Sequence, residues 1–131
     1  MSLKLLLVED KPATQAQLLQ ILVQSQFSVS CANDGLDGLN RVKNKHFDVI
    51  LVDHKMPLMD GMALIKNIRQ LPAYKQTPVI LMTTQDVNQV AGLAEKAGAN
   101  LCLAKPIAAD RLLGLLQDLA STIHNPKQLT V

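Results

Sequence analysis

The sequence alternates between short apolar runs and longer segments whose apolar residues recur at helical spacing. The runs are too short for helices and suit strands that are buried on both faces, which form parallel sheets with helices packed on each side. The predicted strands are Leu5–Val8, Phe27–Ala32, Val49–Asp53, Val79–Thr83 and Leu101–Ala104. This strand–helix alternation predicts an α/β fold with a doubly wound five-stranded parallel sheet and right-handed crossovers.

The segments between these runs carry signals for five helices. Pro12 suits the first turn of a helix, where its missing N–H costs nothing, and apolar spacing extends this helix to about Gln26. Gly98 is a typical C-cap and closes the fourth helix. The remaining helices are predicted from Leu36, Leu39 and Val42, from the segment Gly61–Gln70, and from Leu112, Leu115, Leu116, Leu119 and Ile123.

Composition limits the class of protein. A chain of 131 residues with 48% hydrophobic residues fits one globular domain, and no apolar run approaches the roughly 20 residues of a membrane helix. A net charge of +2 without a Lys/Arg block, and only 2% aromatic residues, argue against direct nucleic-acid binding. The start of the chain runs into the first predicted strand without a signal peptide, so a cytoplasmic location is expected.

The domain is expected to span residues 1–124, with 125–131 as a C-terminal tail or the start of a linker. The two cysteines, Cys31 and Cys102, are far apart and lie in apolar strand contexts. We expect buried free thiols, because a disulfide would conflict with a cytoplasmic location.

Polar residues follow the predicted strands at what should be one edge of the sheet. Glu9 and Asp10 follow the first strand, and Asp53 closes the third. In open parallel sheets, function lies at the carboxyl ends of the strands. Two carboxylates about 4 Å apart repel by roughly 4 kcal/mol at an effective dielectric near 20. A divalent cation would reverse that repulsion, and oxygen ligands suit Mg²⁺.

A hydroxyl and a cation complete this group, because Thr83 and Lys105 follow the fourth and fifth strands. Asp53 is either a third metal ligand or a nucleophile, since aspartyl phosphates are known covalent intermediates. Lys105 would supply a point charge to a transferring phosphoryl group, and Thr83 a hydrogen bond to one of its oxygens. The set favours phosphoryl transfer over ester hydrolysis.

Simpler explanations exist for each of these residues. Glu9 and Asp10 would serve as a helix N-cap, with Asp10 able both to cap and to bind metal. Asp53, Thr83 and Lys105 would be an ordinary strand-ending acid, a strand-ending threonine and a solvated lysine. His54 is a weaker candidate for a metal ligand, because no second His or Cys is placed to join it.

Taken together, these residues resemble those of the receiver domain of two-component response regulators, from Leu3 to about Thr122. The matching features are the Glu9-Asp10 pair, Asp53 with the Met-Pro-Leu-Met-Asp-Gly loop at 56–61, Thr83, and Lys105-Pro106. Each motif alone is weak, but together, in order and at these spacings, they are highly specific. The resemblance implies a flavodoxin-like (βα)5 fold with strand order 2-1-3-4-5.

The resemblance also implies roles. A sensor histidine kinase or phosphotransfer protein would donate a phosphoryl group to Asp53, with Mg²⁺ held by Glu9, Asp10, Asp53 and the backbone carbonyl of Lys55. Lys105 would pair with the phosphoryl group, Thr83 would move toward it, and the Lys105-Pro106 bond would be cis. The output would be a downstream protein partner or a missing output domain, reached through the surface of the fourth helix, fifth strand and fifth helix. Such a protein is not an enzyme beyond its own phosphorylation and dephosphorylation.

Three positions deserve separate expectations. The family usually has an aromatic residue three positions before the lysine, whereas this chain has Cys102, which is too small to act as the same lever. Either another residue supplies the signal, or phosphorylation changes that surface only slightly. Lys55 and Gln85 lie two positions after Asp53 and Thr83, and we hypothesise that both partly cover Asp53 and set its dephosphorylation rate.

Rival functions are less favoured by the sequence. An aspartyl-phosphate phosphohydrolase would need a second catalytic acid two residues after Asp53, where Lys55 stands. A degenerate receiver that is never phosphorylated would be expected to lack site residues that are present here. A flavin-binding protein would need a Ser/Thr-rich phosphate loop after the first strand and aromatic residues to sandwich the flavin.

Overall fold

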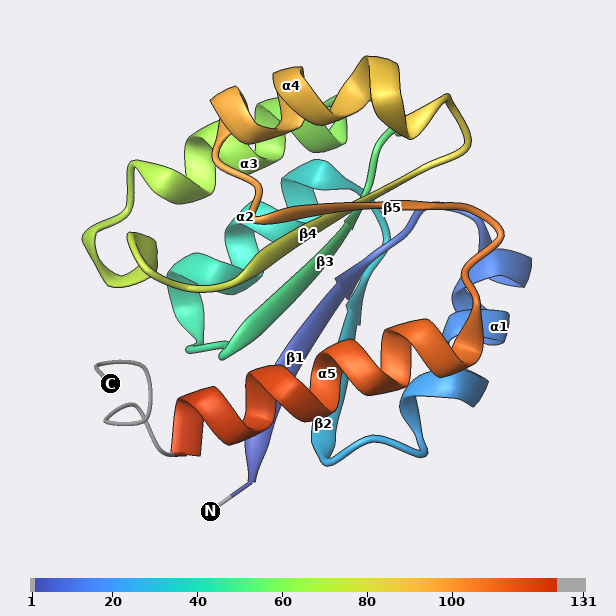
Figure 1. Cartoon of the computed structure of the whole chain (residues 1–131). Helices are drawn as coiled ribbons and strands as arrows, with labels where there is room; N and C mark the ends of the chain where they lie inside the picture. Colours follow the sequence, from blue (N-terminus) through green and yellow to red (C-terminus); the bar gives the residue numbers. More distant parts are fainter. Residues whose placement is uncertain (1, 125–131) are drawn as a thin grey trace.

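The computed structural model describes residues 2–124, so the predicted tail at 125–131 lies outside the described residues. Strands and helices alternate along the chain (Figure 1). The strands are β1 (Leu3–Val8), β2 (Phe27–Ala32), β3 (Val49–Asp53), β4 (Val79–Thr83) and β5 (Leu101–Ala104). The helices are α1 (Pro12–Leu22), α2 (Gly35–Asn44), α3 (Gly61–Arg69), the short 3-10 helix η1 (Pro72–Tyr74), α4 (Val87–Ala97) and α5 (Ala109–His124).

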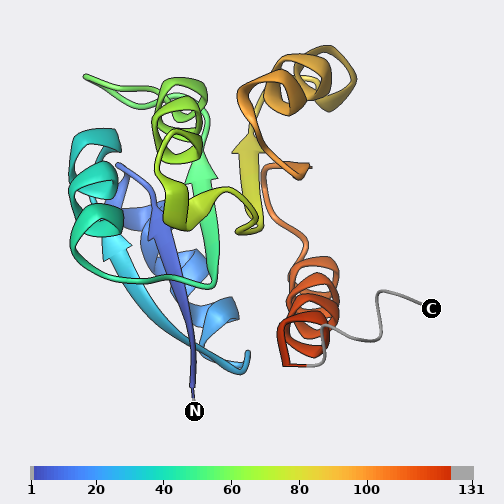
Figure 2. The same ribbon diagram turned by 90° about the vertical axis from the view of Figure 1, so that its left-hand side faces the viewer.

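The five strands form one parallel sheet in the order β2-β1-β3-β4-β5, which confirms the predicted flavodoxin-like topology. Helices cover both faces (Figure 2). On one face, buried side chains of α2, α3 and α4 pack on the sheet. On the other face, buried side chains of α1 and α5 do so. Every residue of β3 is buried, as expected for a central strand between two helical layers.

Side-chain caps begin three of the helices. Asp34, Asp60 and Asp86 each accept a hydrogen bond from a backbone N–H in the first turn of α2, α3 and α4, respectively. Gly98 ends α4 in the left-handed conformation, with φ of 117°, as its C-cap signal predicted. These caps fix where each helix leaves the sheet edge, and hence the loops that carry the polar residues.

The boundaries of two elements differ from those expected. The first helix was predicted to reach about Gln26, but α1 ends at Leu22, its last buried residue; Val23 is already 78% exposed. The Ser25 hydroxyl then donates to the Leu22 carbonyl at 2.6 Å, which favours a turn over another helical turn. β1 begins at Leu3 rather than Leu5, because Leu3 pairs with Phe27 of β2.

The cysteines also differ from their expected burial. Cys31 and Cys102 are free thiols, as predicted, but both are only half-buried. They lie on β2 and β5, the edge strands of the sheet, where one neighbouring strand is missing. Burial raises the pKa of both thiols, chiefly by desolvation, so neither is activated as a thiolate.

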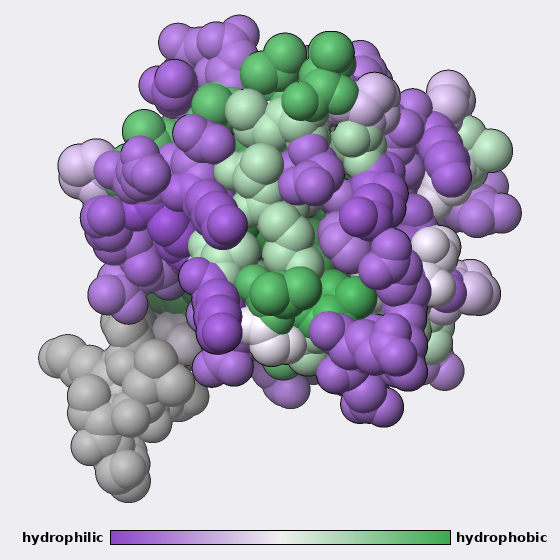
Figure 3. Space-filling model, turned by 90° about the horizontal axis from the view of Figure 1, so that it is seen from above, coloured by the Kyte–Doolittle hydropathy of each residue, from purple (hydrophilic) through white to green (hydrophobic). Residues whose placement is uncertain are grey.

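The surface on the α3–α4 side is partly apolar. Figure 3 shows apolar side chains gathered in a strip that is bordered by hydrophilic ones. Large exposed apolar residues include Leu93 on α4 and Leu101 on β5, which are 62% and 40% exposed. None of the helices in the described part of the chain combines the length and apolarity needed to cross a membrane.

Candidate functional site

Three carboxylates gather at the carboxyl edge of the sheet. β1 and β3 pair in parallel with Val8 opposite Val52, so the residues that follow them emerge together. One ligand oxygen from each of Glu9, Asp10 and Asp53 lies within 4.8 Å of the others. The structure therefore brings together the three acids that the sequence placed at this edge.

Lys105 bridges two of these acids. Its Nζ donates to Glu9 Oε2 and to Asp53 Oδ1, at 2.9 Å each, and only 10% of its side chain is exposed. The backbone N–H of Lys105 donates to the Thr83 carbonyl at 2.8 Å, which anchors the lysine at the end of β5. Burial alone would lower the Lys105 pKa, but the hydrogen bonds to Asp53 and Glu9 raise it. The ammonium is therefore charged at neutral pH.

Glu9 is fully buried, and its Oε1 accepts the Lys11 N–H at 3.2 Å. Burial is the largest influence on its pKa and raises it. The hydrogen bond from Lys105 acts in the opposite direction, whereas the neighbouring Asp53 charge raises the pKa further. The net effect is a raised pKa, so this buried environment disfavours the ionised carboxyl group.

Asp10 has an unpaired oxygen. Within residues 2–124, Asp10 Oδ1 is the one buried side-chain oxygen or nitrogen without a hydrogen-bond partner. The suggestion that Asp10 caps the following helix is wrong, because Lys11 is the N-cap of α1 and no side chain caps it. Pro12 at the first helical position removes one N–H that a cap would satisfy.

The residues present fit a divalent cation. A buried carboxylate oxygen without a partner is costly, and here it lies beside two more carboxylates that share one ammonium. Hard oxygen donors of this kind suit Mg²⁺. His54 is not among the clustered ligand groups, in agreement with the weak case that the sequence made for it.

Thr83 makes a contact that the sequence did not predict. The residue is 1% exposed, and its Oγ1 lies 2.8 Å from Nδ1 of His54, which is 5% exposed. The same Oγ1 accepts the Gln85 N–H at 3.0 Å. Burial lowers the pKa of His54, and the nearby Lys55 charge adds to this effect, so the ring is neutral at pH 7.

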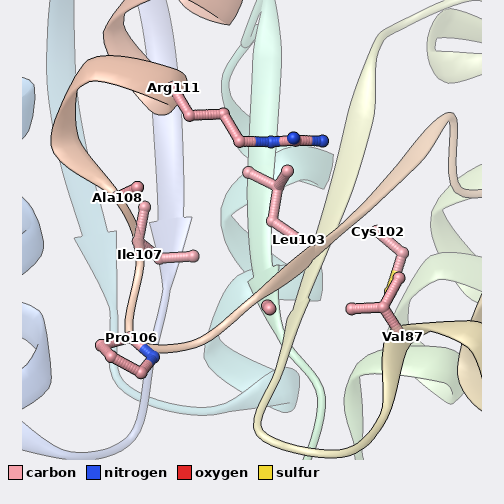
Figure 4. Close-up of a pocket in the computed structure, with 8 residues that line it drawn as sticks. Val87, Cys102, Leu103, Pro106, Ile107, Ala108 and Arg111 are labelled. Carbon is pink, nitrogen blue, oxygen red and sulfur yellow. The ribbon is translucent and has the colours of Figure 1, made fainter.

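The other expected positions surround this centre. Lys55 and Gln85 are exposed, on the loops that follow β3 and β4. The Lys105-Pro106 peptide bond is cis, as the resemblance implied. Cys102 lines an open pocket of about 310 Å³ beside β5. Figure 4 shows Cys102 and Val87 on one side of this pocket and Ile107 and Ala108 on the opposite side.

A parallel sheet with this acidic, lysine-bridged edge defines a class of signalling domains rather than a classical enzyme family. The sequence matches the response regulator receiver domain family over residues 5–117, and the chain belongs to that family.

The relatives include proteins that are much longer than this chain. The chain is 37% identical to the signal transduction histidine-protein kinase BarA of Escherichia coli K12, over 88% of its own length and 13% of BarA. It is 31% identical to the sensory/regulatory protein RpfC of Xanthomonas campestris pv. campestris, over 91% of its own length and 17% of RpfC. The chain thus spans less than a fifth of these two relatives.

Solved structures share the fold over nearly the whole chain. The chemotaxis protein CheY4 of Vibrio cholerae has a TM-score of 0.84 and 30% identity, covering 91% of this chain and 99% of CheY4. The receiver domain of the sensor histidine kinase PA1611 of Pseudomonas aeruginosa has a TM-score of 0.83 and 28% identity, covering 91% and 98%. In that structure a magnesium ion is coordinated in the active-site cleft.

Proposed function

We propose that Asp53 accepts a phosphoryl group in a two-component phosphorelay, with Mg²⁺ bound by Glu9, Asp10, Asp53 and the backbone carbonyl of Lys55. The observation that carries this proposal is the pairing of the Lys105 ammonium with Asp53 Oδ1 at 2.9 Å, beside a buried Asp10 oxygen that has no partner. In this proposal Asp53 is the nucleophile, Lys105 is the cation and Asp10 is an oxygen ligand, and their proximity supports these roles.

The chemistry follows from these side chains. An Asp53 oxygen attacks the phosphorus of a phosphohistidine; the new O–P bond forms as the N–P bond breaks, and the released imidazole takes its proton from water. The Lys105 ammonium, which donates to the Asp53 carboxylate before the reaction, then donates a hydrogen bond to a phosphoryl oxygen. The Thr83 hydroxyl donates a hydrogen bond to a second phosphoryl oxygen. Bound Mg²⁺ would neutralise the charge that accumulates on those oxygens.

The partners follow from the same proposal. A phosphohistidine donor is a sensor histidine kinase or a phosphotransfer protein, and the similarity to the histidine kinases BarA and PA1611 supports this choice. The phosphorylated domain then acts through its α4-β5-α5 face on a downstream protein or on an attached output domain. The protein is a switch without direct nucleic-acid or membrane binding, and it catalyses only its own phosphorylation and dephosphorylation.

The first test is incubation with acetyl phosphate and Mg²⁺, followed by intact mass measurement. We expect the mass of one phosphoryl group to be added to the wild type and to Asp118→Asn, an exposed control on α5. We expect no addition to Asp53→Asn, or to the wild type without Mg²⁺. A folded wild type that binds Mg²⁺ but gains no mass would instead indicate an interaction module that is never phosphorylated.

The lifetime of the phosphorylated state would depend on Lys55 and Gln85. Both are exposed beside the site, on the loops that carry His54 and follow Thr83. If their side chains shield the acyl phosphate from water, Lys55→Ala and Gln85→Ala should each change the rate of phosphate loss. Equal decay rates in both variants and the wild type would remove this role.

A further inference from the structure

His54 and Thr83 are brought together by the register of two central strands. Asp53 of β3 pairs with Met82 of β4, and the His54 N–H donates to the Met82 carbonyl at 2.8 Å. The His54 carbonyl accepts the Gly61 N–H at 2.8 Å, so the backbone of this histidine is fixed on both sides. The side chain is buried as well, so the ring is packed beside the Thr83 hydroxyl.

The hydroxyl of Thr83 has one proton to donate. Its oxygen accepts the Gln85 N–H, and His54 Nδ1 is the acceptor that the hydroxyl contacts among the described residues. We therefore infer that Thr83 donates to His54 Nδ1, because the buried hydroxyl proton would otherwise lack an acceptor. This assigns the Nε2–H tautomer to the neutral ring. The hydrogen bond that Thr83 would donate to a phosphoryl oxygen is thus already donated to His54 Nδ1.

The β5 side of Thr83 offers no comparable partner. Thr83 pairs in register with Ala104, whose side chain is a methyl group. The next residue on that face of β5 is Cys102, which is small and lies beside the open pocket (Figure 4). The contact that holds this threonine therefore comes from β3 and not from the edge strand.

We propose that His54 is a positioning residue that holds Thr83 in the unphosphorylated state, and that its hydrogen bond to Thr83 must break when the Thr83 hydroxyl donates to the phosphoryl group. This inference rests on the proposed phosphorylation of Asp53. His54 and the phosphoryl group compete for one hydroxyl proton, so the hydrogen bond to His54 opposes the phosphorylated conformation. Loss of the Nδ1 acceptor should favour that conformation.

The test measures the affinity for beryllofluoride, a phosphoryl mimic, by calorimetry at saturating Mg²⁺. We expect His54→Leu to bind it about 5- to 10-fold more tightly than the wild type, the change that one net hydrogen bond produces. His54→Asn keeps an acceptor near the Nδ1 position and should return the affinity toward that of the wild type. His46→Leu, at an exposed histidine, is the matched control and should have no effect.

A double-mutant cycle separates positioning from a general structural role. In a Thr83→Val background no hydroxyl remains, so His54→Leu should leave the affinity unchanged. A wild-type affinity in His54→Leu, or an equal gain with and without the Thr83 hydroxyl, would overturn this inference alone. His54→Phe, a second variant without an acceptor at that position, repeats the test if His54→Leu does not fold. A wild type that binds no beryllofluoride would overturn the proposed function as well.

Discussion

At the scale of single residues, the site is short of positive charge. Three carboxylates from Glu9, Asp10 and Asp53 lie close together, and one ammonium, that of Lys105, bridges two of them. Buried carboxylates with incomplete compensation destabilise the fold while preparing the site for a cation.

Replacing Glu9 with glutamine should stabilise the protein when Mg²⁺ is removed with EDTA. The environment raises the Glu9 pKa above its ordinary value of 4.5, so it disfavours the ionised carboxyl group. A neutral isostere avoids that cost, and we expect the Tm at pH 7 to rise by about 3–5 °C, the shift that roughly 1 kcal/mol produces in a domain of this size. Thermal melts followed by circular dichroism measure it.

The stability gained by Glu9→Gln should depend on pH in a direction that the raised pKa determines. A raised pKa in the folded state means that folding favours protonated Glu9, a contribution that is complete below about pH 4.5 and is lost as the pH rises through the folded-state pKa. The advantage of Glu9→Gln should therefore be small near pH 4 and largest above the folded-state pKa. Glu95→Gln, at an exposed glutamate, is the control, and an advantage that grows toward low pH would contradict the argument.

Asp10 should matter for the cation more than for the fold. Its Oδ1 has no hydrogen bond to lose, so Asp10→Asn should leave the free energy of unfolding in EDTA unchanged or higher. The same change removes a hard anionic ligand, and we expect Mg²⁺ affinity to fall by at least about 10-fold, measured by calorimetric titration. Unchanged Mg²⁺ affinity would show that Asp10 is not a ligand.

At the scale of elements, the start of α3 is packed directly on the strand that carries Asp53. A Cβ added at Gly61 would meet the Asp53 carbonyl oxygen and would lie 2.8 Å from Leu81 Cδ1. By contrast, a Cβ added at Gly92, inside α4, would have no atom within 4 Å. The two glycines therefore form a matched pair for testing how tightly the site is supported.

Gly61→Ala should destabilise the protein by about 2 kcal/mol or more, because the clash involves backbone as well as a buried side chain. Gly92→Ala should stabilise it by about 0.5–1 kcal/mol, because alanine is the better residue in a helix interior. Urea unfolding of both variants checks the pair. A similar free energy of unfolding for both would mean that α3 shifts away from β3 at little cost.

The strands that carry the site could be predicted from the sequence, but one contact between them could not. The runs ending at Glu9 and Asp53 were assigned to strands because burial on both faces leaves a continuous apolar signal. The contact between His54 and Thr83 was missed because it depends on the register of two strands, which neither segment encodes alone. The one hint of this contact in the sequence is that His54, with a polar ring, comes directly after a buried strand.

At the scale of the whole molecule, a short loop connects the site to the proposed output face. β4 ends at Thr83, and α4 begins at Val87, only a short loop away. With a cysteine rather than an aromatic residue at 102, either other contacts carry the proposed signal or phosphorylation changes this face only slightly. If other contacts carry it, we expect movement of Thr83 away from His54 to affect this loop most directly, because the Gln85 N–H is hydrogen-bonded to the same hydroxyl oxygen.

Hydrogen exchange can follow that signal across the chain. On addition of beryllofluoride and Mg²⁺, we expect slower amide exchange in α4 and β5. Thr83 would move toward the mimic and make new contacts, and local opening of these elements would then have to break them. Amides in α1 and β2 should keep their rates. Mass spectrometry of peptides from the four elements measures this. Equal rates in α4 and β5 with and without the mimic would contradict a switch at this face.

The two ends of the described chain lie on the side of the molecule opposite the acidic edge of the sheet (Figure 1). Ser2 and Lys4 line the same pocket as Ile123 and His124, so the ends are neighbours. The domain could therefore be fused to another protein at either end, and the acidic edge would remain accessible to solvent. The same proximity makes it a candidate for circular permutation, with new termini opened in a surface loop far from Asp53.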